Sequence, residues 1–152
     1  MAYTIEQIED AAIAALAPLK ASLGVKEIKS YQGELEEADL KKMAGHFPAI
    51  YVVYGGSGYG AHGARKTETM GFELFVCDKS LRTEEEARHG GANNPGTYRM
   101  LRECRSLITG KNLDLTELSP FEIKHDTPVF FGGGISIYAQ GYETAQAHLY
   151  PS

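Results

Sequence analysis

A glycine-rich segment between two β-forming segments constrains the fold of this chain more than any other feature. It contains Gly58-x-Gly60-x-x-Gly63, which formally matches the dinucleotide-binding fingerprint. That fingerprint requires a helix to begin at the glycines, because the N-terminus of the helix holds the pyrophosphate. The segment that follows, residues 67–76, is instead rich in β-forming residues. We therefore predict a strand, a glycine loop and a second strand, which form a long hairpin and disfavour the nucleotide interpretation.

Two other glycine motifs also fail in this segment. Gly58 and Gly63 have the separation of a P-loop, but Ala64 occupies the position where a lysine must reach the phosphates. Ser57 is not a nucleophile elbow, because Tyr59 occupies the second glycine position of that pattern. The segment is better interpreted as a hairpin tip that becomes ordered against a partner.

Length and charge limit the class of protein. A chain of 152 residues predicts a single domain, residues 1–152, that buries about 70% of its unfolded surface. The net charge of −5 argues against a general nucleic-acid binder. It is compatible with a ring through which DNA only passes. No segment approaches the roughly 20 apolar residues of a membrane span, so we expect no membrane partner.

The first residues predict a helix over 4–22. Thr4 and Gln7 form a capping-box sequence, and apolar residues then recur at helical spacing up to Leu23. Gly24 occupies the position of a C-terminal glycine cap. Pro18 should kink the helix or distort its last turn.

The rest of the chain alternates between strands and helices. We predict strands over 25–31, 48–54 and 67–78, helices over 34–43 and 95–110, and final strands that include 130–131 and 135–142. Shorter apolar segments lie at 113–118 and 121–124. Strands outnumber the possible crossovers, so the fold class is α+β, with a mixed, mostly antiparallel sheet and two to three helices packed on it.

Residues with catalytic or metal-binding chemistry show no motif. The five histidines share no i, i+4 spacing on a predicted helix, and neither Cys77 nor Cys104 belongs to a Cys-x-x-Cys pair. We expect both thiols to be buried in a reducing cytoplasm. The acidic runs 34–37 and 84–86 are typical of solvated faces rather than paired catalytic carboxylates. The sequence thus predicts no catalytic residue, no metal and no cofactor.

Two segments are candidates for contacts with partner chains. The hairpin tip, residues 55–66, and the charged segment 79–94, predicted to be a long loop, are the places where function or disorder would concentrate. Mixed charges suit a protein contact, in which they set register and partner choice. The alternative for the second segment is an exposed loop with no partner. The candidate interface residues are Tyr59, His62, Arg65, Lys66, Arg82, Glu84, Glu85, Arg88 and His89.

Tyrosines add a second interface signal. The chain has nine tyrosines and no tryptophan, and six of the tyrosines lie in or beside the predicted strands and the hairpin tip. Such side chains bury much area and keep one polar atom, which suits interfaces, although some of them should only complete the sheet. The six are Tyr51, Tyr54, Tyr59, Tyr138, Tyr142 and Tyr150.

Several short patterns together resemble a known family. They are Thr4-Ile5-Glu6 at the helix start, Pro48-Ala49-Ile50-Tyr51 in a strand, Gly96-Thr97-Tyr98-Arg99-Met100-Leu101, and Leu107-Ile108-x-Gly110 with Leu113 before the last hairpin. With these patterns the chain resembles the small tail protein family of Mu-like phages and prophages, formerly of unknown function. That family is similar in element order to the tail terminator proteins of long-tailed phages.

The resemblance implies a structural role without catalysis. Tail terminators form a ring, typically of six subunits, that caps the tail tube, stops its polymerisation and joins the head. The implied partners are further copies of this chain, the tail tube protein and the head connector protein, with the sheath protein as a further candidate. The implied location is the virion tail, with assembly in the host bacterial cytoplasm. Alternatives are another head–tail joining or tail tube component, or a small nucleotide-binding enzyme that uses the glycine segment.

Overall fold

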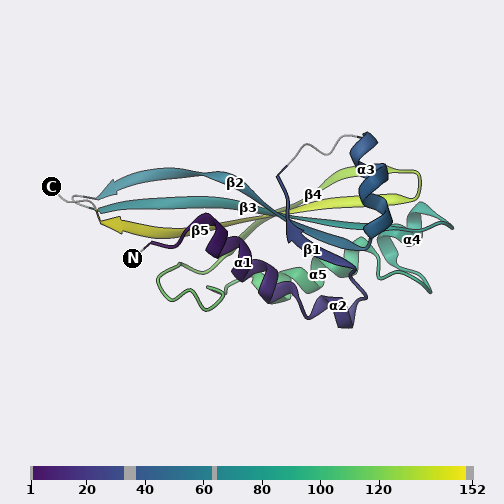
Figure 1. Cartoon of the computed structure of the whole chain (residues 1–152), viewed down its shortest axis with the longest axis horizontal. Helices are drawn as coiled ribbons and strands as arrows, with labels where there is room; N and C mark the ends of the chain where they lie inside the picture. The colour runs from purple at the N-terminus through teal and green to yellow at the C-terminus, as the bar shows by residue number, and fades with distance from the viewer. Residues whose placement is uncertain (1, 33–36, 63–64, 150–152) are drawn as a thin grey trace.

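The computed structural model describes residues 2–32, 37–62 and 65–149, and within them the chain forms one five-stranded sheet with helices on both faces (Figure 1). The strand order is β1-β2-β3-β5-β4. The strands are β1 (Glu27–Ser30), β2 (Ala49–His62), β3 (Arg65–Lys79), β4 (Glu122–Gly132) and β5 (Ile135–Leu149). The β1–β2 pair is parallel and the other three pairs are antiparallel, which confirms the predicted α+β class.

The helices follow the sequence signals closely at the N-terminus. The Thr4 hydroxyl accepts a hydrogen bond from the Gln7 backbone N–H, and the Gln7 side chain accepts one from the Thr4 N–H, so the predicted capping box is present. The predicted helix over 4–22 is divided into two helices at Pro18, where the sequence predicted a kink or a distorted last turn. The helices are α1 (Ile5–Leu16), α2 (Leu19–Ser22), α3 (Glu37–Met43), α4 (Glu84–His89) and α5 (Thr97–Ile108), with a 3-10 turn at Ala44–His46.

The two faces of the sheet bury two separate cores. In β2, Ile50 and Val52 belong to the larger core under α1, α2 and α5. Ala49 and Tyr51 point to the opposite face and pack in a smaller core with Leu40 of α3. This alternation along one strand follows from the two-residue period of the pleat. The sheet is therefore covered on both faces near β1.

The glycine-rich segment is strand rather than loop, which corrects the sequence prediction. Residues 56–62 pair in register with residues 65–71 of β3, which in turn pair with residues 143–149 of β5. Pairing with β3 satisfies the backbone groups and outweighs the low strand propensity of glycine. A register shift between Tyr54 and Gly56 is the one irregularity in this pairing. We call these three strand segments the arm.

The segment 79–94 contains a helix, which the sequence analysis missed. The Thr83 hydroxyl accepts a hydrogen bond from the Glu86 N–H, so Thr83 caps α4. Acidic residues fill the first turn of α4 and Arg88 and His89 fill its last turn, in the order that the helix dipole favours. The charges interpreted as a solvated loop therefore belong to a short capped helix that ends at Gly90.

Three other boundaries differ from the predictions. Helix α5 begins after Gly96 rather than at Pro95, because Gly96 has a φ of +86°, which a helix cannot contain. One strand, β4, includes most of the apolar segment 121–124 and the predicted strand residues 130–131. Strand β5 continues to Leu149 instead of ending near residue 142. The segment 113–118 forms turns, with positive φ angles at Leu113 and Asp114.

Candidate functional site

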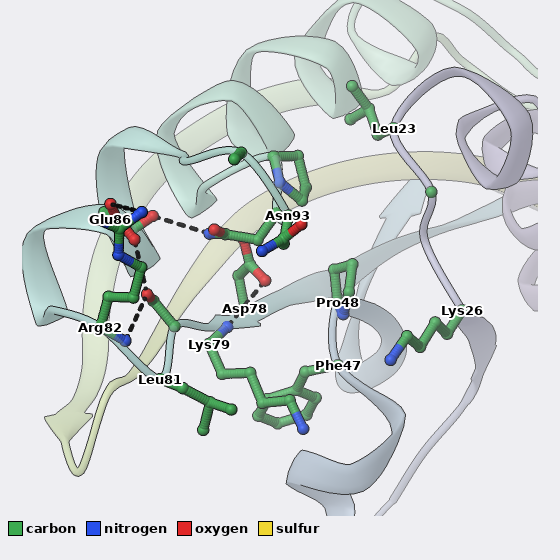
Figure 2. A pocket seen from close by; sticks show the side chains of 15 residues that line it. Leu23, Lys26, Phe47, Pro48, Asp78, Lys79, Leu81, Arg82, Glu86 and Asn93 are labelled. Carbon is green, nitrogen blue, oxygen red and sulfur yellow. Dashed lines mark hydrogen bonds and ion pairs between the residues drawn. The ribbon is translucent and has the colours of Figure 1, made fainter.

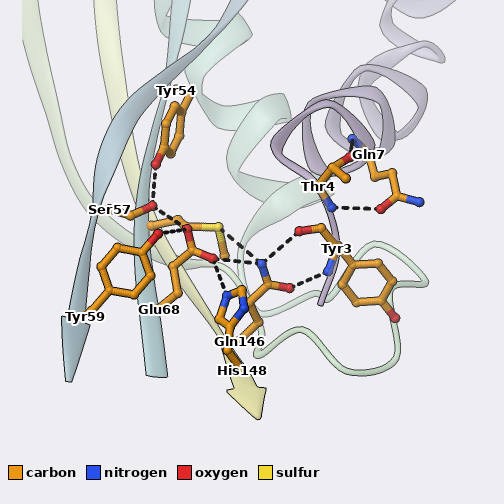
Figure 3. A network of polar contacts seen from close by, with 10 residues as sticks. Tyr3, Thr4, Gln7, Tyr54, Ser57, Tyr59, Glu68, Gln146 and His148 are labelled. Atoms are coloured by element: carbon orange, nitrogen blue, oxygen red, sulfur yellow. Dashed lines mark hydrogen bonds and ion pairs between the residues drawn. The ribbon is translucent and has the colours of Figure 1, made fainter. Parts of the chain in front are cut away.

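A buried carboxylate, Glu68, organises the arm. The residue as a whole is 5% exposed, and Figure 3 shows its side chain between side chains of β2 and β5. One carboxylate oxygen accepts hydrogen bonds from Ser57 Oγ at 2.7 Å and Tyr59 OH at 3.2 Å. The other lies 3.0 Å from Gln146 Nε2 and 2.7 Å from His148 Nε2. Four side chains from two neighbouring strands thus meet at one residue of the strand between them.

The same network ties the N-terminus to the arm. The Gln146 side chain accepts a hydrogen bond from the Tyr3 N–H at 2.8 Å and donates one to the Tyr3 carbonyl at 3.0 Å.

Burial works to raise the pKa of Glu68, but the hydrogen bonds from its partners outweigh it and hold that pKa below its usual value. The ionised form of Glu68 is therefore the form that this network stabilises.

A second buried carboxylate, Asp78, holds the connection between α4 and α5. It accepts hydrogen bonds from the Lys79 N–H at 2.8 Å, from Asn94 Nδ2 at 2.9 Å and from the Gly96 N–H at 2.7 Å. Burial raises the pKa of Asp78, while these donors oppose the shift only in part. Three donors already occupy the Asp78 carboxylate. Asp78 therefore has a structural role, because its contacts fix the start of α5.

A hollow of about 270 Å³ lies beside Asp78 (Figure 2). Phe47 and Pro48 form part of its wall, and Lys26, Lys79 and Leu81 lie around it. Leu81 is 98% exposed. The hollow therefore combines an apolar wall with charged side chains of both signs, which include Arg82 and Glu86.

Four of the predicted interface residues lie at the end of the arm. Tyr59 is 59% exposed and still donates a hydrogen bond to Glu68. Arg65 and Lys66 are exposed on β3. His62 pairs with Arg65 through the backbone, and its side chain lies outside the described residues, as does Tyr150. The structure thus brings these residues together as one group.

The other five predicted interface residues lie on or next to α4, far from the arm tip along the molecule's long axis (Figure 1). Arg82 forms an ion pair with Glu86 at 3.9 Å, and His89 forms one with Glu85 at 3.5 Å. Glu84 is exposed at the start of the helix. The two predicted groups therefore form two separate surfaces.

An exposed aromatic cluster next to α4 was missed by the sequence analysis. The ring of Tyr98 lies 5.4 Å from the ring of His89 and 5.9 Å from that of Tyr138, which lies 5.5 Å from the ring of Phe131. Tyr98 is 42% exposed and Phe131 is 44% exposed. The members of this cluster come from four elements, so no local sequence pattern predicts it. The repeated Tyr and Phe in the predicted strands were the one indication in the sequence.

The tyrosines predicted for interfaces divide between core and surface. Tyr51 and Tyr142 are buried, so they belong to the cores. The Tyr51 hydroxyl donates a hydrogen bond to Glu27 at 2.8 Å. Of the predicted tyrosines, Tyr59 is the one whose side chain is mainly exposed in the described part of the chain.

Cys77 and Cys104 are buried and free, as predicted, and burial raises the pKa of both thiols. Among residues 2–32, 37–62 and 65–149, no three histidine, cysteine or acidic side chains gather closely enough to bind a metal ion. No helix in this part of the chain combines the length and apolarity that crossing a membrane requires.

These features define a small α+β protein with a long strand arm at one end and a charged, aromatic surface at the other. The chain belongs to the family described as Bacteriophage Mu, Gp37, whose model matches residues 4–147. This match confirms the resemblance to a Mu-like phage family. None of the curated proteins matches the chain.

Solved structures contain the same fold. A chain of the virion of a native gene transfer agent particle is similar to this protein with a TM-score of 0.59 and 12% sequence identity. The similar region covers 97% of this chain and 100% of that chain. The likeness therefore extends over the whole fold rather than over a shared substructure.

Proposed function

We propose that this protein is a tail terminator, which forms a ring on the end of the phage tail tube, stops its polymerisation and joins it to the head. The observation that carries the proposal is membership of a bacteriophage Mu family together with a fold similar to that of a chain in a virion. The proposed ring contains six copies, and DNA passes through it without a dedicated site.

The two surfaces at the ends of the molecule support this proposal. A subunit of such a ring must contact its neighbours, the tube and the head connector, so it needs several distinct surfaces on one small protein. The arm tip carries Tyr59, Arg65 and Lys66, and the α4 end carries Arg82 and Arg88. We assign both ends to contacts with partner chains.

The glycine segment gives no support to the nucleotide-binding alternative. Gly58 and Gly60 lie inside β2, and Arg65–Lys79 form β3. A dinucleotide site of the fingerprint type needs a helix N-terminus at that place. The second candidate function is therefore another head–tail joining or tail tube component, which shares the family and fold observations.

Removal of the gene from an inducible prophage tests the proposal. We expect tails of uncontrolled length that do not join heads, and normal length when the wild-type chain is supplied from a plasmid. Complete absence of tails would assign the protein to the tube instead. Tails of normal length that fail only to join heads would assign it to a joining component.

A further inference from the structure

The exposed side of α5 is basic. Arg99, Arg102 and Arg105 follow one another at three-residue spacing, which places them on one side of the helix, and all three are exposed. Arg105 forms an ion pair with Asp126 at 3.1 Å. Arg99 and Arg102 form no ion pair with any residue that the structure describes. We call Arg99 and Arg102 the basic face.

The first turns of α1 are acidic. Glu6, Glu9 and Asp10 lie at i, i+3 and i+4, so they neighbour one another on the helix surface. Glu6 and Asp10 are exposed, and Glu9 is half-buried. Within the described ranges none of the three has a cationic partner. We call these three residues the acidic face.

The two faces lie on neighbouring helices that cover the same face of the sheet over different strands. Helix α1 packs on β1 and β2, whereas α5 packs on β3 and β5. With the strand order β1-β2-β3-β5-β4, α1 lies toward one sheet edge and α5 toward the other. Opposite charges on two different helices match when copies are arranged head to tail, whereas a two-fold axis through either charged face would bring like charges together.

We propose that the basic face of one copy binds the acidic face of the next copy, and that this heterologous contact closes the ring. The inference rests on the proposed function, because it assigns the subunit contact of the proposed ring. Tyr98 precedes Arg99 and contributes exposed aromatic area beside the basic face. Tyrosine and arginine at the centre of an interface are the residue types that carry most binding energy.

Charge reversal on each face separately should prevent ring formation. In one variant Arg99→Glu is combined with Arg102→Glu, and in the other Glu6→Arg is combined with Asp10→Arg. Each variant alone brings like charges together at every subunit contact, so we expect the association constant to fall by at least about tenfold. A control variant combines Lys20→Glu with Lys42→Glu, exposed positions outside both faces, and has the same net charge as the arginine variant. The control should form rings as the wild type does.

An equimolar mixture of the two variants is the decisive sample. At one kind of contact, the reversed basic face of the first variant meets the reversed acidic face of the second. At the other kind, the native basic face of the second variant meets the native acidic face of the first. Alternating rings with equal numbers of both variants should therefore form. Native mass spectrometry resolves the two variants by mass and gives the composition. Circular dichroism of each variant before mixing establishes that the chain is folded, and the chain with all four substitutions should also form rings.

Several outcomes would overturn the inference. Rings formed by either variant alone, or no rings from the mixture of folded variants, would contradict the assigned contact while the wild-type ring, and with it the proposed function, stands. Retained rings with weakened binding of double-stranded DNA in the arginine variant would assign the basic face to DNA instead. A wild-type chain that forms no ring in solution or on tail tubes would overturn the proposed function as well.

Discussion

His148 Nε2 lies 2.7 Å from Glu68 Oε1, across the paired strands β5 and β3. The Glu68 side chain is 7% exposed and the His148 side chain is 23% exposed, so the contact is largely shielded from water. Ser57 and Tyr59 reach the same carboxylate from β2. A single buried anion therefore joins three strands in the arm, which explains how a glycine-bearing strand remains ordered there.

The first prediction concerns the loss of this anion. In Glu68→Gln one of the two acceptor oxygens becomes an amide nitrogen, so two of the four donors lose their acceptor. An unsatisfied buried polar group costs about 1–3 kcal/mol, and we expect the free energy of unfolding to fall by that amount. Urea titration measures it. The control is Asp114→Asn, an exposed position with a φ of +63° that asparagine tolerates. Equal stability of the two variants would contradict the role of Glu68.

The second prediction concerns pH. The pKa of Glu68 is below its ordinary value of 4.5 in the folded chain, because the hydrogen bonds outweigh burial. The stabilising contribution of Glu68 is therefore complete above pH 4.5 and is lost as the pH falls below that value. The pKa of Asp78 is shifted upward, so the contribution of Asp78 to the pH dependence of stability has the opposite sign. Asp78 is present in both the wild type and Glu68→Gln, so comparing the two proteins at each pH removes its contribution.

Between about pH 5 and pH 3 the wild type should lose more of its free energy of unfolding than Glu68→Gln does. Urea titrations of both proteins at each pH give the two curves. Parallel curves would mean that the protonation of Glu68 is not linked to folding.

The sequence predicted those features that depend on neighbouring residues. The capping box of Thr4 and Gln7 and the break at Pro18 are local, so both could be predicted. The Glu68 network could not, because β-sheet register brings Glu68 next to Gln146 and places His148 on the same face two residues later. No spacing along the chain reports a contact between residues 80 positions apart.

Helix α4 shows how composition can mislead. Its charges are typical of a loop, and Gly90 and Gly91 follow it directly. Its stability comes from the Thr83 cap and from Asn94 Nδ2, which donates to the Glu86 carbonyl at 2.8 Å across the following turn. Of the candidate interface residues on α4, Glu84, Glu85 and His89 are exposed and Arg88 is half-buried, and their helical arrangement depends on that tertiary contact.

The third prediction concerns the turn between β4 and β5. Gly134 has a φ of +78°, and a Cβ atom there would lie 2.2 Å from the Ser80 carbonyl oxygen. Gly134→Ala should lower the free energy of unfolding by more than about 1 kcal/mol, because the strained backbone and the contact both oppose folding. The matched control is Gly58→Ala in the arm, where a Cβ atom meets nothing within 4 Å. Thermal unfolding of both variants measures the difference, and a smaller effect at Gly134 than at Gly58 would be inconsistent with this geometry.

The fourth prediction concerns Asp78. In Asp78→Ala the buried Gly96 N–H and the Asn94 amide lose their acceptor, so the start of α5 should loosen. Hydrogen exchange at the Gly96 amide should become at least about tenfold faster, as expected when a hydrogen bond of more than about 1.4 kcal/mol is lost. Exchange in the middle of β3, away from Asp78, provides the internal reference. Unchanged exchange at Gly96 would show that the carboxylate does not hold this connection.

The fifth prediction concerns salt. If subunits meet through the basic and acidic faces, ions should screen the contact, because exposed charges are screened beyond about 8 Å at physiological ionic strength. As the sodium chloride concentration is raised, rings should therefore dissociate already at higher protein concentrations. Mass photometry measures the fraction of rings at each protein concentration. Ring stability that rises with salt would favour an apolar contact through the Tyr98 cluster instead.

Native mass spectrometry of the wild-type chain, with negative-stain imaging of the same sample alone and with isolated tail tubes, tests the terminator proposal most directly. We expect closed rings of six copies with a central hole, either free or seated on one end of each tube. A chain that stays monomeric in solution and binds along the tube wall, or does not bind the tube, would contradict the proposal.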